Sequence, residues 1–152
     1  MKYLDTNIFL YPVLFTDAKG AACRDLLKGA ASGQFDAVTS CLTWDEFVYV
    51  LLRTLGREVA AAQGAMLLQF PGLVLAPADA AILARAQDLI TNTPLRPRDA
   101  LHAATALRYG AAAFVSDDPD FDHLPGLVRE PPLNSAGPAP DQPIKAVDPD
   151  TN

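Results

Sequence analysis

The sequence predicts a single α/β domain built on a parallel sheet of short strands. Four short apolar runs, at residues 3–4, 37–39, 73–75 and 112–115, are bounded by turn or cap residues. They lack polar alternation, as strands buried on both faces do. Longer segments with apolar residues at helical spacing lie between them. This alternation of strands with helices or helix pairs is the pattern of an α/β domain with right-handed crossovers.

Composition limits the possible classes of protein. The chain has 152 residues, of which 50% are hydrophobic, so one sizeable core is expected. A formal net charge of -6 argues against nucleic-acid binding through a broadly basic surface, but leaves room for a local basic patch or a metal-bridged contact. Two cysteines, Cys23 and Cys41, cannot make a disulfide scaffold and are interpreted as small buried apolar groups. With no signal-peptide pattern and no apolar stretch of ~20 residues, we expect a cytoplasmic protein without a membrane segment.

The first third of the chain is expected to contain one strand and two helices. The strand at residues 3–4 ends at Asp5-Thr6-Asn7, and a helix should begin near Ile8. Residues 18–31 are also predicted to be helical, although Gly20 and Gly29 lower the intrinsic helix propensity.

The middle of the chain should add a pair of helices. Apolar residues at positions i, i+3, i+4, i+7, i+8 and i+11 form one stripe that ends at Gly56. Its members are Trp44, Phe47, Val48, Leu51, Leu52 and Leu55. A second helix, with Val59, Met66, Leu67 and Phe70 as its apolar residues, is stopped by Pro71-Gly72.

Two further helices are predicted before the last apolar run. Pro77 should open the first, and Pro94 and Pro97 lie beyond its end. Its inward-facing residues are expected to be Ile82, Leu83, Ala86, Leu89 and Ile90. The second helix is marked by Ala100, Ala103, Ala104 and Leu107, and is closed by Gly110.

The composition changes near residue 130. Residues 131–152 hold six of the 13 prolines and few large aliphatic side chains. We therefore expect a globular domain over residues 1–130 and a Pro-rich, extended or disordered tail over residues 131–152.

Several carboxylates occupy the positions where an α/β sheet binds ligands, at the carboxyl ends of its strands. Asp5 follows the first apolar run, and Asp117 and Asp118 follow the last one, while Glu46 and Asp99 open helices. Carboxylates that converge repel one another unless a divalent cation neutralises them, and oxygen ligands favour Mg²⁺ or Mn²⁺. Such a site suits phosphoryl chemistry.

Each acid also has a simpler interpretation. Thr43 and Glu46 match a capping box, and Asp99 and Asp5 are each in place to cap a helix. Residues 117–122 could form a solvated acidic turn. The metal-site hypothesis is favoured because one sheet edge can gather four separate acidic positions.

Other chemistries find less support. His102 shares a helix face with Asp99, and a core or supporting role is favoured over catalysis, while His123 is expected at the surface. These two histidines, with no cysteine near either, argue against a zinc site. Neither a glycine-rich phosphate loop nor a Gly-x-Ser-x-Gly elbow is present.

These motifs together resemble the PIN-domain ribonucleases, and in size and layout the chain looks like a VapC-type toxin of a toxin–antitoxin pair. The matching stretches are residues 3–8, Glu46, residues 98–106 and residues 115–121. The resemblance implies a three-layer domain with helices on both faces of the sheet. It also carries the family's acidic quartet over to Asp5, Glu46, Asp99 and Asp118. Asp117 and Asp120 remain open as alternatives to Asp118.

The same resemblance implies a mechanism and partners. Asp5, Asp99 and Asp118 would bind Mg²⁺ or Mn²⁺ for cleavage of an RNA phosphodiester by activated water, and Glu46 would complete the pocket. Hydrogen bonds from Thr6, Asn7 and Ser116 would support this site. An antitoxin protein that blocks the crevice and a homodimeric toxin are further implications.

Two arginines and two rival functions complete the sequence-based hypotheses. Arg96 and Arg98 are the cations best placed to contact RNA, because they immediately precede Asp99.

One rival function is that of a phosphohydrolase of the haloacid-dehalogenase type with Asp5 as nucleophile, which normally needs an aspartate at the position of Asn7. The other is a non-catalytic PIN-fold protein that binds a partner.

Overall fold

The computed structural model describes residues 1–122 and 124–133. The expectations for His123 and for most of the Pro-rich tail, residues 134–152, therefore lie outside the described part of the chain. Within that part, no helix combines the length and the apolar character that crossing a membrane requires.

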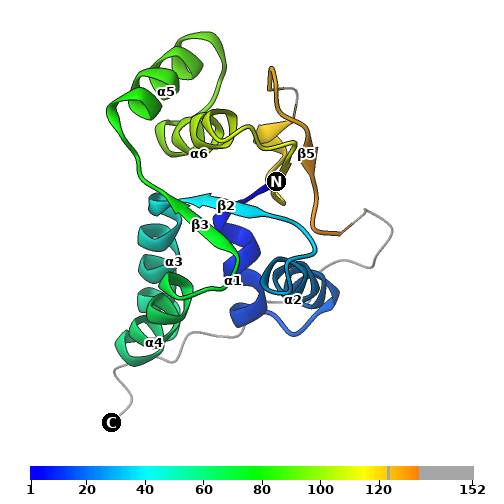
Figure 1. Cartoon of the computed structure of the whole chain (residues 1–152). Coiled ribbons are helices and arrows are strands. Elements are labelled where there is room, and N and C mark those ends of the chain that lie inside the picture. Colours follow the sequence, from blue (N-terminus) through cyan, green and yellow to red (C-terminus); the bar gives the residue numbers. More distant parts are fainter. Residues whose placement is uncertain (123, 134–152) are drawn as a thin grey trace.

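Within the described residues, five parallel strands form the central sheet, in the order β3-β2-β1-β4-β5 (Figure 1). They are β1 (Lys2–Leu4), β2 (Ala37–Ser40), β3 (Leu73–Ala76), β4 (Ala113–Val115) and β5 (Arg129–Glu130). The four predicted strands are confirmed. The fifth was not predicted, because a two-residue strand of charged side chains carries no apolar signal; the ion pair between Lys2 and Glu130 links it to β1.

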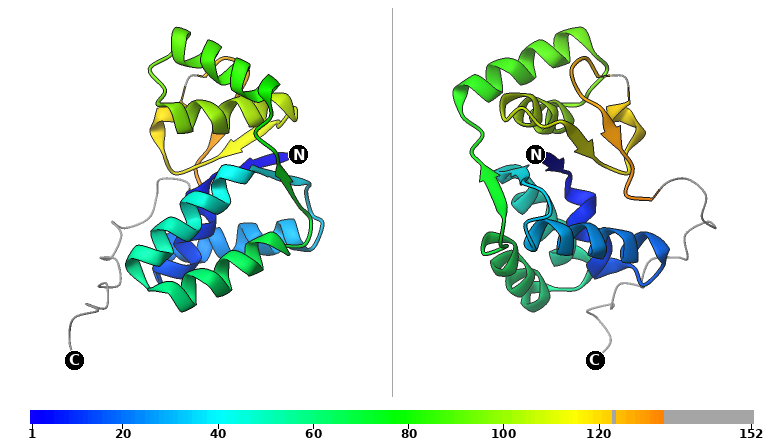
Figure 2. Two further views of the ribbon diagram at one scale, coloured as in Figure 1. Left: turned by 90° about the vertical axis from the view of Figure 1, so that its left-hand side faces the viewer. Right: turned by 45° about the vertical axis from the view of Figure 1, so that its right-hand side comes forward.

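Helices cover both faces of the sheet, as the predicted α/β class requires (Figure 2). The helices are α1 (Thr6–Leu14), α2 (Ala18–Ala31), α3 (Cys41–Thr54), α4 (Arg57–Leu68), α5 (Ala80–Asn92) and α6 (Pro97–Arg108). Figure 1 shows α5 and α6 on one face and α1 to α4 on the other. The domain is thus three-layered.

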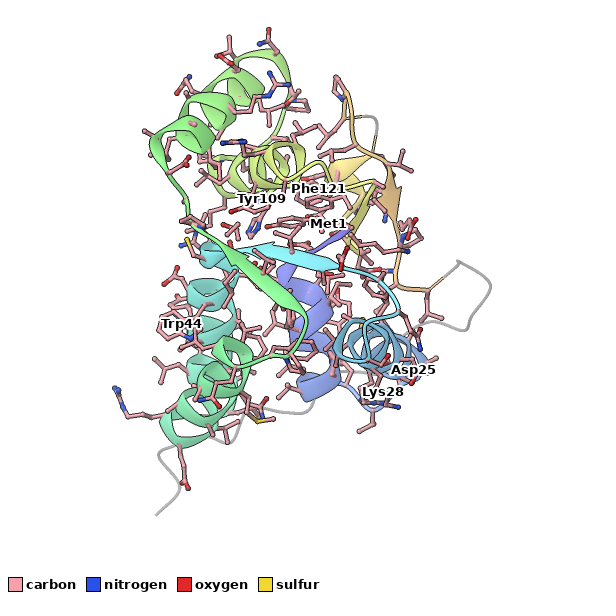
Figure 3. All side chains as sticks on the ribbon, in the orientation of Figure 1. Met1, Asp25, Lys28, Trp44, Tyr109 and Phe121 are labelled. Carbon is pink, nitrogen blue, oxygen red and sulfur yellow. The ribbon has the colours of Figure 1, made fainter. Side chains whose placement is uncertain are left out.

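Strand alternation divides the buried side chains between two cores. Tyr3 of β1 and Phe114 of β4 pack with the buried residues of α5 and α6. Their neighbours Leu4 and Val115 pack with those of α1 to α4. On the α6 side, the ring of Phe121 packs against that of Phe114 at a tilt of 30°, with the centroids 4.2 Å apart, and Figure 3 shows Phe121 beside α6. Each face of this short sheet therefore has its own apolar layer.

Three expected helix starts are wrong by a few residues. α3 begins at Cys41 with Ser40 as its N-cap, so Thr43 is not a cap. α5 is capped by Asp79, whose side chain accepts from the backbone N–H of Ile82, and not opened by Pro77. α6 follows Arg96, which places Asp99 in the first turn and not at the cap. In each case another residue occupies the N-cap position, although Arg96 makes no side-chain capping hydrogen bond. The capping interpretations therefore do not account for Thr43, Glu46 or Asp99.

The predicted apolar stripes are buried only in part. Trp44 and Leu52 are 38% and 39% exposed, and Trp44 lies on the outer side of α3 in Figure 3, where its Nε1 donates to the carbonyl of Gly64 in α4. On α5, Leu83 and Ile90 are 52% and 37% exposed, because a narrower stripe of Ile82, Ala86 and Leu89 makes the contact with the core. Cys23 is buried as expected, but Cys41 is exposed, contrary to expectation.

Gly20 allows α1 and α2 to pack closely. A Cβ atom there would lie 2.3 Å from the carbonyl oxygen of Phe15. Only glycine fits without a backbone shift, so this residue has a packing role that outweighs its low helix propensity.

Candidate active site

A pocket of about 350 Å³ opens at the carboxyl edge of the sheet and contains all four predicted acids. Asp5 directly follows β1, Asp118 lies in the turn after β4, Glu46 projects from α3, and Asp99 projects from the first turn of α6. The pocket is lined by Asp5, Thr6, Asn7, Leu10, Glu46, Tyr49, Val50, Arg98, Asp99, His102, Asp118 and Phe121. Elements that are distant in sequence thus bring these carboxylates to one crevice.

Asp5 lines this pocket as a nearly buried, hydrogen-bonded carboxylate. It is 7% exposed, and its Oδ1 accepts from the backbone N–H of Thr6 at 2.7 Å. Its Oδ2 accepts from Asn7 Nδ2 at 2.7 Å and from Ser116 Oγ at 2.6 Å. Burial raises the pKa of Asp5 above its usual value, and the charge of Glu46 adds to the rise, although His102 and the hydrogen bonds act against it. Asp5 also caps α1, so the capping interpretation and the site hypothesis both apply to it.

Glu46 is fixed by a hydroxyl and an imidazole. Its Oε2 accepts from Thr6 Oγ1 at 2.6 Å and lies 3.0 Å from Nε2 of His102. The other imidazole nitrogen, Nδ1, lies 2.6 Å from Oη of Tyr3. Tyr3 and His102 are both buried, so this series of contacts runs from the core to the pocket wall. His102, interpreted from the sequence as a core or supporting residue, therefore lies beside the acids.

Glu46 and His102 shift each other's titration. Burial alone would raise the pKa of Glu46, but the hydrogen bond and charge of His102, with Thr6 and Arg98, lower it below its usual value. Burial alone would lower the pKa of His102, but the hydrogen bond to Glu46 and the charges of Asp5, Glu46 and Asp99 raise it. The pair therefore favours a negative Glu46 beside a positive His102.

The pKa of Asp99 is raised by burial and by the other acids of the pocket. Burial raises its pKa first, the charge of Asp118 raises it further, and Asp120 and Glu46 add to this effect against the opposing charge of His102. Asp118 makes its hydrogen bonds to residues near it in sequence: its backbone N–H donates to Ser116 Oγ at 3.0 Å, and its Oδ1 accepts from the N–H of Asp120 at 2.9 Å. Asp99 and Asp118 thus face one another with a repulsion that a cation between them would relieve.

Asp117, an alternative to Asp118 in the sequence, makes contacts outside the pocket. Its Oδ2 accepts from Lys19 Nζ of α2 at 2.6 Å and from Tyr11 Oη of α1 at 2.9 Å. This ion pair is partly buried, with side-chain exposures of 25% for Lys19 and 28% for Asp117. Asp120, the other alternative, is exposed in the 3-10 turn Pro119–Phe121 and is not among the residues that line the pocket.

Of the two predicted cations, only Arg98 lies at the pocket. Its guanidinium is 3.8 Å from Oε1 of Glu46 and 3.9 Å from Oδ2 of Asp45, and its side chain is 61% exposed. Arg96 is exposed at the N-cap of α6 and does not line the pocket. Arg98 is therefore the better placed of the two to meet an anion there.

The donor set fits a hydrated Mg²⁺ or Mn²⁺ ion. Among residues 1–122 and 124–133, no three His, Cys, Asp or Glu side chains are grouped closely enough to hold a metal ion by themselves. Mg²⁺ does not need such a cage, because it keeps several waters and binds through one or two carboxylates together with substrate phosphates. Carboxylate oxygens are hard ligands that suit such a cation. The raised pKa values of Asp5 and Asp99 mean that their ionised forms are disfavoured without it, and a bound cation would stabilise them.

Sequence reasoning missed Tyr3 and Tyr49. Tyr3 was assigned only to a strand, and its hydroxyl role depends on a contact 99 residues away in sequence. Tyr49 is 52% exposed and lines the pocket. Its position three residues after Glu46 was a signal for it, because residues spaced by three share a helix face.

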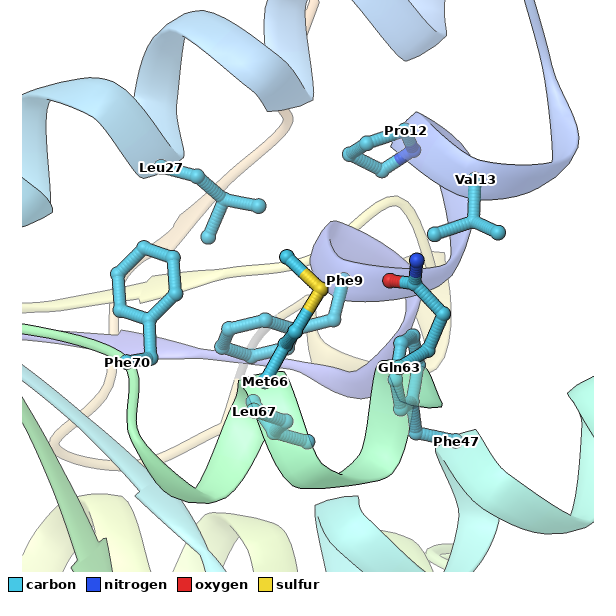
Figure 4. Close-up of a pocket in the computed structure, with 9 residues that line it drawn as sticks. All are labelled: Phe9, Pro12, Val13, Leu27, Phe47, Gln63, Met66, Leu67 and Phe70. Carbon is cyan, nitrogen blue, oxygen red and sulfur yellow. The ribbon is translucent and has the colours of Figure 1, made fainter. Parts of the chain in front are cut away.

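A second, apolar hollow of about 160 Å³ lies among α1, α2, α3 and α4 (Figure 4). It is lined by Phe9, Pro12, Val13, Leu27, Phe47, Gln63, Met66, Leu67 and Phe70. Met66, at the edge of this hollow, is 64% exposed.

Comparison with known proteins adds sequence evidence to this geometry. A family model described as PIN domain matches residues 2–127. Ribonuclease VapC7 of Mycobacterium tuberculosis is 35% identical over 136 residues, which cover 85% of this chain and 90% of that protein.

Solved structures share the fold at lower identity. VapBC2 from Rickettsia felis, bound to a promoter DNA fragment, superposes with a TM-score of 0.68 at 21% identity and covers 86% of this chain and 98% of that one. VapC20 from M. tuberculosis, described as a toxin that cleaves the sarcin-ricin loop, gives a TM-score of 0.67 at 19% identity, with coverages of 80% and 92%.

Proposed function

The chain belongs to the PIN-domain family, and from this premise we propose that it is a metal-dependent endoribonuclease, the toxin of a toxin–antitoxin pair. The observation that carries the proposal is the 35% identity to a named ribonuclease over 90% of that protein's length. The pocket with Asp5, Glu46, Asp99 and Asp118 supports it, because the reaction needs several carboxylates at one place.

Asp5, Asp99 and Asp118 are the residues that would hold Mg²⁺ or Mn²⁺. When bound, the cation would lower the pKa of a water and neutralise charge on the phosphate that this water attacks. Three donors orient the two oxygens of Asp5, and its remaining lone pairs would be available to the cation. Thr6, Asn7 and Ser116 are proposed to supply this orientation.

Glu46 and Arg98 are proposed to act on water and on phosphate. Thr6 and His102 hold Glu46 in its ionised form, so its carboxylate can accept a hydrogen bond from the attacking water. Arg98, exposed and close to Glu46, can pair with a phosphate oxygen. Arg96 remains a weaker RNA contact at the start of the same helix.

The partners follow from the family and from two apolar surfaces. We propose that an antitoxin binds this chain, since the structures that resemble it include a toxin–antitoxin complex. The apolar hollow of Figure 4 would accept apolar side chains of such a partner. We also propose a homodimer; Leu83 and Ile90 on α5 are apolar surface that a second copy could cover.

The two rival functions are less well supported. A phosphohydrolase of the haloacid-dehalogenase type with Asp5 as nucleophile would need a second aspartate two positions later, but Asn7 stands there and its Nδ2 donates to Oδ2 of Asp5. A non-catalytic partner-binding protein would not need four acids in one pocket, two of which have raised pKa values.

RNA cleavage by the purified protein tests the proposal. The wild type should cut total cellular RNA with Mg²⁺ or Mn²⁺ and lose this activity in a chelator. Asp5→Asn should be folded by circular dichroism and inactive, whereas Asp25→Asn, on the exposed face of α2, should remain active. Undiminished cleavage by folded Asp5→Asn, or hydrolysis of a small phosphomonoester without RNA cleavage, would overturn it.

A further inference from the structure

One face of α3 leads from the carboxylate pocket toward solvent. Glu46, Tyr49, Val50 and Arg53 are spaced i, i+3, i+4 and i+7, so they form one stripe along the helix. The first three line the pocket, and Arg53 lies roughly 10 Å beyond Glu46 along the helix axis, at about 1.5 Å per residue. The opposite face of α3 carries Phe47 and Leu51, which belong to the core.

Tyr49 presents an aromatic ring to the solvent beside the site. Its side chain is 52% exposed, whereas Phe47 and Leu51 on the same helix are 3% and 0% exposed. The core of the domain therefore does not require an aromatic residue at position 49. Contact with a ligand accounts for a large exposed ring beside these carboxylates better than packing against the core does.

Arg53 holds this ring and adds a positive charge. Its NH1 donates to Tyr49 Oη at 3.1 Å, and its Cζ lies 5.8 Å from the ring centroid. Arg53 is itself exposed. The pair thus joins a flat π-surface to a guanidinium, and these are the two groups that bind an unpaired base and its neighbouring phosphate. In a chain of net charge -6, a cation near the site matters more than it would on a basic surface.

We propose that Tyr49 and Arg53 form a nucleobase subsite, in which a base next to the cleaved phosphate stacks on Tyr49 while Arg53 binds an adjacent phosphate. The inference rests on the proposed ribonuclease function and adds a substrate requirement to it. Bases inside a duplex are stacked and paired, so only RNA that is unpaired at this position can use the subsite. Duplex RNA would lack this contact and bind through its phosphates alone.

Binding of a short single-stranded RNA of mixed sequence, labelled with a fluorophore, tests the subsite. The Asp5→Asn protein serves as the parent in the binding assay, so that the probe is not cut. Tyr49→Leu keeps an apolar side chain without the ring and should weaken binding about tenfold, since stacking on an aromatic ring is lost. Tyr49→Phe keeps the ring and should stay within about twofold of the parent. The same probe annealed to its complement should bind all three proteins alike.

The salt dependence tests Arg53 separately. Arg53→Gln should weaken binding of the single strand and reduce the slope of log K against log salt by about 1. Arg85→Gln removes the same charge from the exposed face of α5 and should leave the slope unchanged. Equal slopes for these two variants would overturn the role of Arg53.

Two outcomes separate the subsite from the function on which it rests. Cleavage of RNA by the otherwise wild-type protein, together with Tyr49→Leu binding that equals the parent, would overturn the subsite and leave the nuclease intact. Weaker single-strand binding by Tyr49→Leu, with no cleavage by the wild type in Mg²⁺ or Mn²⁺, would support the subsite and remove the nuclease function. Equal loss of duplex and single-strand binding would also overturn the subsite.

Discussion

Nε2 of His102 lies 3.0 Å from Oε2 of Glu46, and this contact joins the buried core to the pocket. The backbone N–H of Ser40 donates to Oη of Tyr3 at 3.0 Å, and Nδ1 of His102 lies 2.6 Å from the same oxygen. In the positive form that the pair with Glu46 favours, both imidazole nitrogens carry a proton, so Nδ1 donates to Tyr3 and Nε2 donates to Glu46. The orientation of Glu46 is therefore set from inside the domain.

The pair of Glu46 and His102 should make stability depend on pH. The raised pKa of His102 adds stability that is complete below its unfolded pKa of about 6.5 and is lost as pH rises through the folded value. The lowered pKa of Glu46 adds stability that is present above its unfolded value of 4.5 and is lost as pH falls through the folded value. The difference in free energy of unfolding between the wild type and His102→Gln, from urea denaturation in a chelator, should therefore peak between these limits. A difference that does not vary with pH would contradict this ion pair.

Removing the hydroxyl of Tyr3 should destabilise the domain. Tyr3→Phe keeps the ring that stacks on Phe114, but leaves the N–H of Ser40 and Nδ1 of His102 without this partner in the core. A buried polar group without its hydrogen bond costs about 1–3 kcal/mol, so urea denaturation should show a loss of about 2 kcal/mol. Tyr109→Phe, on a partly buried ring, is the matched control and should change stability by less. Equal losses in the two variants would contradict the buried hydrogen-bond chain.

Adjacent aspartates should have different roles. Asp117→Asn breaks the ion pair with Lys19 and should lower the free energy of unfolding by about 1 kcal/mol, while RNA cleavage persists. Asp118→Asn changes a pocket residue and should abolish cleavage with little loss of stability. Denaturation and cleavage measured on both variants check this. The reverse pattern would assign the pocket ligand to Asp117.

Neutralising Asp99 should stabilise the metal-free protein. Its raised pKa means that Asp99 ionises at a cost in the fold, so the stability it contributes is complete below its unfolded pKa of 3.8 and is lost as pH rises through the folded pKa. Asp99→Asn should therefore unfold at a higher temperature than the wild type at neutral pH in a chelator. This advantage should disappear in acid, where Asp99 of the wild type is protonated. A less stable Asp99→Asn at neutral pH would contradict the raised pKa of Asp99.

The sequence allowed the sheet and the convergence of the acids to be predicted for a simple physical reason. Parallel strands end at one edge, so Asp5 and Asp118, each just after an apolar run, had to lie near one another. β5 could not be predicted, because its two charged residues pair through backbone contacts that leave no pattern. Helix starts were misplaced because Ser40, Asp79 and Arg96 occupy the N-cap positions, and not Thr43, Pro77 and Asp99, which the local sequence also allowed at the helix starts.

The other features that could not be predicted from the sequence depend on the direction in which side chains point. Asp117 and Asp118 are adjacent in sequence, but only their contacts with Lys19 and Ser116 show which one belongs to the pocket. The link from Tyr3 to His102 joins residues 99 positions apart and has no local signal. Stripes on α3 and α5 were predicted too broadly, since periodicity gives the direction of a helix face but not how much of it the neighbours cover.

Calorimetric titration with Mn²⁺, combined with RNA cleavage in the same buffer, tests most directly whether the carboxylate pocket is a metal-dependent nuclease site. The wild type and Asp25→Asn should bind Mn²⁺ with equal affinity and cleave RNA. Asp99→Asn should bind Mn²⁺ more than about tenfold more weakly and lose cleavage. Equal Mn²⁺ affinity and undiminished cleavage in folded Asp99→Asn would contradict the assignment of this pocket.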